Sequence, residues 1–146
     1  MRMQRAGHSV TATTRSSENV RELKRLIDDV RQLDINDADP DLSFLGDLQG
    51  LLISVAPTRR NEAYGDVFER GMRSLAAALR RRISTQPLHI TYISSVSVYG
   101  DQRGEEVNES AALDTRSPVN SMLATAEELM LDIDRPDTSI CVLRLG

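Results

Sequence analysis

Short apolar runs that alternate with longer amphipathic segments constrain the fold of this chain more than any other feature of its sequence. Residues 51–55 form one such run, and residues 89–95 and 139–145 form two more. Runs of this length, bounded by turn residues, are typical of parallel strands that are buried on both faces. The segments between them repeat apolar side chains with a period of about 3.6 residues, which predicts helices. The alternation therefore predicts an α/β fold.

The first third of the chain continues this alternation. A β-branched segment follows Gly7, which can end a helix, and an amphipathic segment then begins at Ser16 or Ser17, either of which is a good N-cap. Strands separated by helices imply a doubly wound, mainly parallel sheet. The expected strands are residues 8–14, 30–35, 51–55, 89–95 and 139–145, and the expected helices are residues 17–27, 41–48, 62–82 and 117–133.

Composition and charge argue against several classes of protein. Apolar residues make up 40% of the 146 residues, and the net charge is −4 without a basic stripe, so we expect no nucleic-acid binding. The run Arg80-Arg81-Arg82 is interpreted as cations at a helix end, the alternative being a phosphate-binding patch. No segment approaches the roughly 18 apolar residues of a membrane span. We therefore expect a cytoplasmic protein that does not bind membranes.

The sequence offers no set of residues for a metal site. Cys141 is the one cysteine, and its place in an apolar run predicts that it is buried in the core. His8 and His89 each stand without a second histidine or cysteine at ligand spacing. We therefore expect neither a disulfide nor a bound metal.

Residues 92–101 carry the most information about function. They join an apolar strand to two serines and then to a Val-Tyr-Gly turn. This order resembles the fifth strand and following turn of extended short-chain dehydrogenases/reductases, especially nucleotide-sugar epimerases and dehydratases. Ser95, four residues before Tyr99, falls at the position of that family's catalytic serine. The resemblance covers nearly all of residues 1–146 and implies part of an NAD(P)-binding, Rossmann-like domain.

Further segments resemble the parts of this family that contact the cofactor. One follows the second strand and holds the adenosine ribose, one is an adenine-side pair after the third strand, and one is a turn after the fourth strand. The resemblance thus implies cofactor contacts at Thr14, Arg15, Asp34, Ile35, Ala56, Pro57 and Ser94.

The family's proton-transfer pair is missing from this sequence. The pair is a tyrosine and a lysine four residues later, which places a cation beside the phenol on one helix face. The register set by Ser117 and Glu127 puts Val119 at the tyrosine position and Leu123 at the lysine position, and neither can move a proton. The chain's one lysine, Lys24, lies on a helix of the other half of the sheet.

Two polar residues of the segment 92–101 could take part in chemistry. Ser95 could hydrogen-bond a substrate or cofactor oxygen, or it could simply satisfy nearby backbone at the strand end. We interpret Tyr99 as a structural turn residue rather than a substitute acid/base, because the sequence shows no cation beside it.

The glycine-rich turn that holds a dinucleotide's pyrophosphate is also missing. We therefore expect an incomplete Rossmann-like sheet without its first strand, which normally lies between the second and fourth strands. Either those strands close the gap, or another chain supplies a strand, or the domain is marginally stable.

The residues after the expected second strand bear on cofactor choice. Arg15 stands where NAD-binding relatives tend to carry an acid, so NADP is favoured over NAD, unless Arg15 is an ordinary solvated loop residue. By resemblance the partners are a dinucleotide, a sugar-nucleotide-like small molecule and a second copy of the chain. The functions left open are a catalytically impaired epimerase/dehydratase-type domain, a non-catalytic NADP-sensing or interaction module, and part of a longer oxidoreductase.

Overall fold

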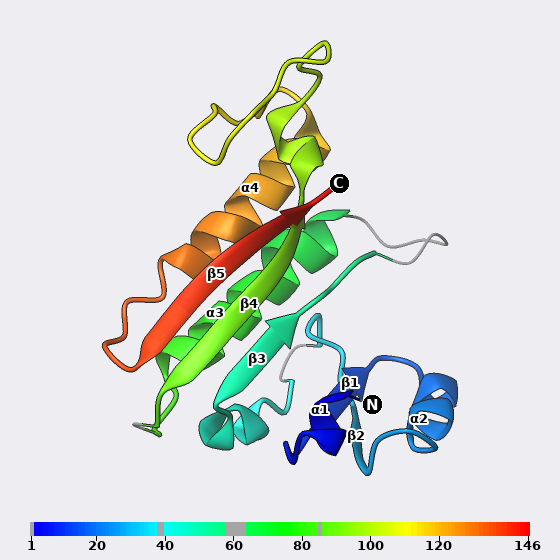
Figure 1. Ribbon diagram of the computed structural model, residues 1–146. Helices are drawn as coiled ribbons and strands as arrows, with labels where there is room; N and C mark the ends of the chain where they lie inside the picture. Colours follow the sequence, from blue (N-terminus) through cyan, green and yellow to red (C-terminus); the bar gives the residue numbers. More distant parts are fainter. Residues whose placement is uncertain (1, 38–39, 58–63, 85) are drawn as a thin grey trace. The chain divides into compact units, whose positions relative to one another are not determined.

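The computed structural model describes residues 2–37, 40–57, 64–84 and 86–146, and the chain divides into two compact units, Met1–Asp41 and Leu42–Gly146. The first unit contains α1 (Arg2–Arg5), β1 (Thr11–Thr14), α2 (Ser17–Leu23) and β2 (Asp29–Gln32). Strands β1 and β2 pair in parallel, and α2 connects them (Figure 1). This unit is a small βαβ motif of the expected kind.

Local hydrogen bonds explain where the elements of the first unit begin and meet. Ser16 rather than Ser17 is the N-cap of α2, and its hydroxyl accepts from the backbone N–H groups of Glu18 and Asn19 at 3.2 and 3.3 Å. The Thr11 hydroxyl of β1 donates to the Asp29 carboxylate of β2 at 2.7 Å. The two strands are therefore joined at their first residues by side chains as well as by backbone.

The second unit is a three-stranded parallel sheet in the order β3-β4-β5 (Figure 1). Its strands are β3 (Gly50–Ile53), β4 (Leu88–Ser95) and β5 (Thr138–Leu145). Its helical segments are the 3₁₀ turn η1 (Ser43–Asp47), the π-helical stretch η2 (Asp66–Gly71), α3 (Met72–Arg80), the 3₁₀ turn η3 (Val96–Tyr99) and α4 (Pro118–Leu131). The α/β class and the parallel strands predicted from the sequence are confirmed.

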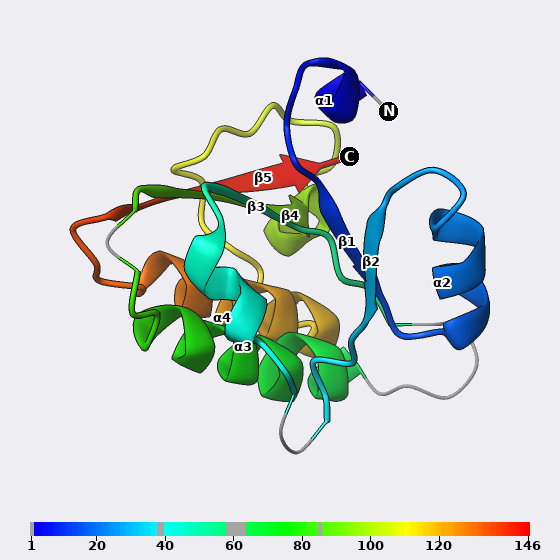
Figure 2. The same cartoon turned by 90° about the horizontal axis from the view of Figure 1, so that it is seen from below.

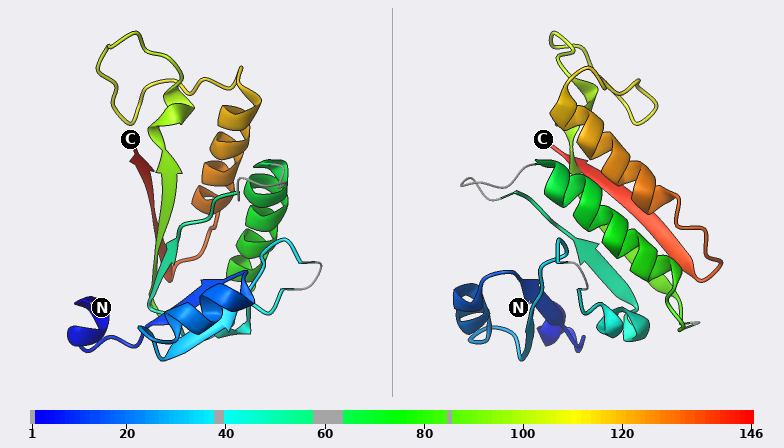
Figure 3. Two further views of the ribbon diagram at one scale, coloured as in Figure 1. Left: turned by 90° about the vertical axis from the view of Figure 1, so that its right-hand side faces the viewer. Right: turned by 180° about the vertical axis from the view of Figure 1, so that it is seen from behind.

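The core of the second unit lies between the sheet and the helices α3 and α4. Figure 2 shows these helices forming a layer beneath the strands, and the right panel of Figure 3 shows them side by side over one sheet face. The most deeply buried residues come from both layers: Met72, Ala76, Leu79, Leu88, Ile90, Tyr92, Val98, Ala126 and Met130.

One face of this sheet is more deeply buried than the other, which corrects the expectation of burial on both faces. The side chain of Leu52 is 66% exposed, whereas the next residue, Ile53, is buried. Cys141 is exposed and not in the core as predicted, because β5 alternates between half-buried and exposed positions. The helices described for this unit cover one face of the sheet. Because side chains alternate along a strand, every second one points to the opposite face, which these helices do not cover.

Two further details differ from the sequence-based expectations. The amphipathic segment predicted at 62–82 is π-helical over Asp66–Gly71 before α3 begins, and residues 62 and 63 lie outside the described residues. Strand β1 pairs with β2 and β3 with β4, and within the described ranges no ladder joins the two sheets.

Candidate functional site

The carboxyl ends of β4 and β5 bring four polar side chains together in the second unit. Ser94 ends its inward-facing row on β4, Tyr99 ends the turn η3, Glu127 comes from α4, and Arg144 comes from β5. In open α/β sheets ligands bind outside the carboxyl ends of the strands. We call these four residues the Glu127 cluster.

A bidentate ion pair forms the centre of the Glu127 cluster. Arg144 donates from Nη2 to Glu127 Oε2 at 2.7 Å and from Nε to both carboxylate oxygens at 3.1 and 3.2 Å. Glu127 is 2% exposed, and a carboxylate so buried is tolerated only when it is paired. The hydrogen bonds from Arg144 to this carboxylate raise the pKa of Arg144 well above its ordinary value.

The two serines of the sequence motif have different partners. Ser94, predicted to contact a cofactor, is buried and donates its hydroxyl proton to Glu127 Oε1 at 2.5 Å. Ser95, predicted at the catalytic position, is half-buried, and its hydroxyl accepts from the backbone N–H of Ser97 at 3.1 Å. Ser95 thus caps the 3₁₀ turn, as the structural interpretation of this residue anticipated, and its own O–H proton remains free for another acceptor in the described structure.

Tyr99 has a cation beside it, contrary to the expectation from sequence. Arg144 Nη1 donates to the Tyr99 hydroxyl at 2.6 Å, and the guanidinium carbon lies 4.9 Å from the centre of the ring. The partner lies 45 positions away in sequence, so no local pattern indicates the pairing. The one available signal is that Arg144 interrupts the apolar run of β5.

Val119 and Leu123, which stand at the positions of the family's proton-transfer pair, pack in the apolar core. Leu123 is buried in the hydrophobic core of the second unit, and Val119 is half-buried and packed against that core. With Glu127 they follow one another at four-residue intervals along α4, on one helix face. This face therefore presents two apolar side chains and then one carboxylate.

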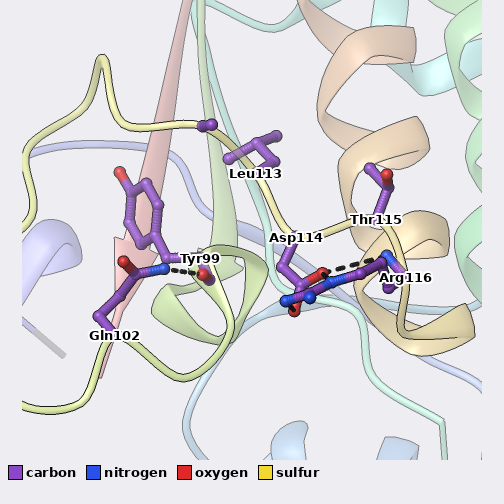
Figure 4. Close-up of a pocket in the computed structure, with 7 residues that line it drawn as sticks. Tyr99, Gln102, Leu113, Asp114, Thr115 and Arg116 are labelled. Carbon is purple, nitrogen blue, oxygen red and sulfur yellow. Dashed lines mark hydrogen bonds and ion pairs between the residues drawn. The ribbon is translucent and has the colours of Figure 1, made fainter.

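A pocket of about 350 Å³ lies beside Tyr99 (Figure 4). Tyr99 and Gln102 line one side, and the loop that carries Leu113, Asp114 and Arg116 lines the other. The side-chain amide of Gln102 donates to the Tyr99 carbonyl oxygen. Hydrogen bonds from Arg116, at 2.7 and 3.1 Å, lower the pKa of Asp114 below its ordinary value. The two charges of this pocket are thus already paired with each other.

The predicted adenosine-side residues gather at the carboxyl ends of β1 and β2 in the first unit. The Thr14 carbonyl accepts from the N–H of Leu33 at 2.9 Å, and the Arg15 carbonyl accepts from the side chain of Gln32 at 2.9 Å. The Asp34 carboxylate accepts from the N–H of Asn36 at 2.9 Å. The structure therefore brings Thr14 and Arg15 close to the start of the segment that contains Asp34.

The remaining predicted cofactor contacts are Ile35, Ala56 and Pro57. Ile35 is half-buried beside Asp34. Ala56 is exposed and Pro57 half-buried just beyond β3, at the same end of the sheet as Ser94, since β3 and β4 are parallel. Over the described residues, no group of three histidine, cysteine, aspartate or glutamate side chains could hold a metal ion. No helix in these ranges is long and apolar enough to cross a membrane.

Comparison with known proteins gives one family and many similar folds. The model of the NAD dependent epimerase/dehydratase family matches residues 1–146. A Stenotrophomonas maltophila UDP-glucose-4-epimerase with bound NAD and formylated UDP-arabinopyranose shares 22% identity at a TM-score of 0.70, over 97% of this chain and 46% of that one. No curated protein matches the sequence significantly.

Two other solved structures show the same fold. A Bacillus cereus UDP-glucuronic acid 4-epimerase in complex with NAD has 21% identity and a TM-score of 0.67, over 95% of this chain and 46% of that one. The Bordetella bronchiseptica enzyme WbmG in complex with NAD and UDP has 12% identity and a TM-score of 0.72, over 99% and 47%. The chain spans about half the length of these structures.

Proposed function

The chain belongs to the NAD-dependent epimerase/dehydratase family, and from that premise we propose that it is an NAD(P)-binding domain whose proton-transfer pair has been lost. The observation that carries the proposal is the place of Ser94 and Ser95. They are the last two residues of β4, and Ser94 is bonded to the buried Glu127–Arg144 pair. Ligands of open α/β sheets bind at this end of the strands.

In the first unit, Thr14, Arg15, Asp34 and Ile35 are the proposed adenosine-side contacts. They follow the carboxyl ends of two parallel strands, and Thr14 and Arg15 are tied by hydrogen bonds to residues 32 and 33. Arg15 would pair with a 2′-phosphate through charge-assisted hydrogen bonds, so we propose NADP rather than NAD as the cofactor.

In the second unit, Ala56, Pro57, Ser94 and Ser95 are the proposed nicotinamide-side residues. The Ser95 hydroxyl, whose proton is not used by the backbone bond it accepts, would donate to a substrate oxygen. Ser94 would act through Glu127, because its own proton is already donated to that carboxylate. When bound, the dinucleotide would supply the hydride chemistry.

The proposed impairment follows from α4. Val119 and Leu123 cannot accept or donate a proton, and both pack in the apolar core. We therefore expect no turnover of NADPH or NADH with aldehyde, ketone or nucleotide-sugar substrates, measured by nicotinamide absorbance. Turnover by the purified chain that Ser95→Ala abolishes would contradict the impairment.

A probe for the adenosine side is adenosine 2′,5′-bisphosphate, which carries the 2′-phosphate without the nicotinamide. We expect it to bind the whole chain more tightly than adenosine 5′-phosphate in calorimetry, and Arg15→Gln to remove the difference. Arg81→Gln, an exposed arginine of the second unit, is the matched control. Equal binding of both nucleotides by the unaltered chain would count against NADP.

The second candidate function is a non-catalytic NADP-sensing or protein-interaction module, and the third is part of a longer oxidoreductase. The retention of cofactor-side residues in a chain with apolar side chains at 119 and 123 favours a sensing role. A sugar-nucleotide-like ligand and a homodimer belong to the proposal by family resemblance, and a cytoplasmic location belongs to it as the sequence-based expectation. Failure of the folded chain to bind any dinucleotide would remove the sensing version.

A further inference from the structure

One carboxylate joins three segments of the second unit. Glu127, on α4, accepts from Ser94 on β4 and from Arg144 on β5. Replacing a buried ion pair with apolar residues often leaves stability unchanged or improves it. Stability alone is therefore a poor reason for a charge at this depth.

The Glu127 cluster holds both ends of the segment that contains Ser95. Ser94, directly before this segment, is bonded to Glu127, and Tyr99, at its end, is bonded to Arg144. Between them, the backbone N–H of Ser97 donates to the Ser95 hydroxyl at 3.1 Å, and the N–H of Gly100 donates to the Ser97 carbonyl at 2.9 Å. The position of the Ser95 hydroxyl is thus set by a turn whose two ends meet at one ion pair.

We propose that Glu127 and Arg144 are positioning residues that fix the 95–99 turn, and with it the Ser95 hydroxyl, for the bound ligand. Helix α4 has apolar residues at 119 and 123, but it still contributes to the site through Glu127 on the same helix face. The proposal rests on the proposed function for the identity of the ligand. The fixing of the turn is a property of the chain by itself and can be measured without a ligand.

The first test is amide hydrogen exchange on the full chain, using Tyr99→Phe and Ser94→Ala. Each variant removes one hydroxyl and keeps the ion pair, so folding is retained. We expect the amides of Ser97, Gly100 and Asp114, the last of which donates to the Val98 carbonyl at 2.8 Å, to exchange about 10-fold faster, which corresponds to about 1.4 kcal/mol. The amide of Leu88, bonded to the Asp137 carbonyl at the other end of β4, keeps its rate.

Arg70→Ala is the matched control, because Arg70 forms an exposed ion pair with Asp66 within η2 and takes no part in the Glu127 cluster. It leaves all of these exchange rates unchanged. Equal acceleration of the turn amides and of Leu88 would mean that the cluster serves general stability only. Unchanged rates at the turn in both variants would likewise overturn the proposal.

The second test is NADPH titration of the same variants and of Glu127→Gln, which keeps an acceptor for Ser94 but loses the charge. We expect each to bind NADPH about 10-fold more weakly at a temperature where it is fully folded, with Arg70→Ala unchanged. Unaltered affinity in all three folded variants would refute positioning for the ligand. If the unaltered chain binds no dinucleotide, the proposed function fails, and the exchange rates alone decide whether the turn is held by the cluster.

Discussion

Two buried tyrosines on neighbouring segments show how differently one residue type is used in this chain. The Tyr99 hydroxyl accepts from Arg144 at 2.6 Å. Tyr92 is fully buried, and within the described structure its hydroxyl has no hydrogen-bond partner. Burial, and then the negative charge of Glu127, raise the pKa of Tyr92 far above its ordinary value, so its phenol stays neutral.

The Tyr92 hydroxyl is therefore a cost to the folded state. We expect Tyr92→Phe to raise the free energy of unfolding by about 1 kcal/mol, because the ring is kept and an unsatisfied buried group is removed. Urea denaturation at neutral pH measures the change, with Tyr64→Phe on an exposed tyrosine as the control. A clear loss of stability would show that this hydroxyl has a partner in solution.

Arg82 is a second residue whose role differs from its sequence-based interpretation. Its side chain is 1% exposed, and it donates to the carbonyl oxygens of Leu45 and Leu48 at 3.1 Å and to Asp137 at 3.3 Å. We expect Arg82→Ala to lower the free energy of unfolding by about 3 kcal/mol, since the Leu45 and Leu48 carbonyl oxygens would lose their donor, whereas Asp137 would keep Arg135.

The neighbouring Arg81 is exposed and provides the control for this prediction. Arg81→Ala is expected to change the free energy of unfolding by less than about 0.5 kcal/mol in the same urea series. Equal effects at the two positions would support the original interpretation of the arginine run as helix-end cations.

Among the elements, the turn after β4 depends on one glycine. Gly100 has a φ of +70°, and a Cβ added there would lie 2.5 Å from an Asp114 carboxylate oxygen. We expect Gly100→Ala to destabilise the chain by about 2 kcal/mol, from backbone strain and this clash together. Thermal unfolding measures it, and Gly46→Ala, where an added Cβ meets nothing within 4 Å, is the comparison.

A double variant separates the two causes. In an Asp114→Gly background the clash is absent, so adding Gly100→Ala is expected to cost only about 1 kcal/mol, from the positive φ. If Gly100→Ala costs as much in that background as in the unaltered chain, the contact with Asp114 is ruled out as a cause.

Most elements were predictable from sequence because their signals are local. Strand β4 was expected at 89–95 and spans Leu88–Ser95, and α4 was expected at 117–133 and spans Pro118–Leu131. Periodicity and capping residues fix such segments. The exposure of Cys141 was not predictable, because an apolar run looks alike whether one or both faces of its sheet are covered.

The candidate site was predictable in part for the same reason. The serines and the Val-Tyr-Gly turn form a contiguous motif, and the structure places them at the carboxyl end of β4. The cation beside Tyr99 depends on β4 and β5 being adjacent, which places Arg144 opposite Ser94 in the sheet register. Such long-range pairing carries no mark in the sequence around either residue.

For the whole molecule, several paired carboxylates predict loss of stability in acid. Hydrogen bonds from Thr11 and then Arg31 lower the pKa of Asp29, and Arg135 lowers that of Asp137, both from an ordinary value of 3.8. Because the pKa of each of these carboxyls is lower in the folded chain than in the unfolded chain, the unfolded chain binds protons first as the pH falls. The stabilisation is therefore complete above the ordinary pKa and is lost as the pH falls through the lowered folded values.

Urea unfolding between about pH 6 and about pH 2 measures this dependence. We expect the free energy of unfolding to fall steadily below about pH 4. In Asp137→Asn the fall should be shallower, because one linked carboxyl has been removed. Stability that stays constant down to about pH 2 would mean that these carboxylates are not paired in solution.

At the scale of the whole chain, we propose a dinucleotide-binding domain without proton-transfer groups. NADPH titration of the full chain, followed by nicotinamide fluorescence beside a parallel NADH titration, tests it most directly. We expect saturable NADPH binding with a dissociation constant of about 10⁻⁴ M, weak because the sequence lacks a glycine-rich phosphate-binding turn, and weaker binding of NADH. A chain that unfolds cooperatively yet binds neither nucleotide would contradict it.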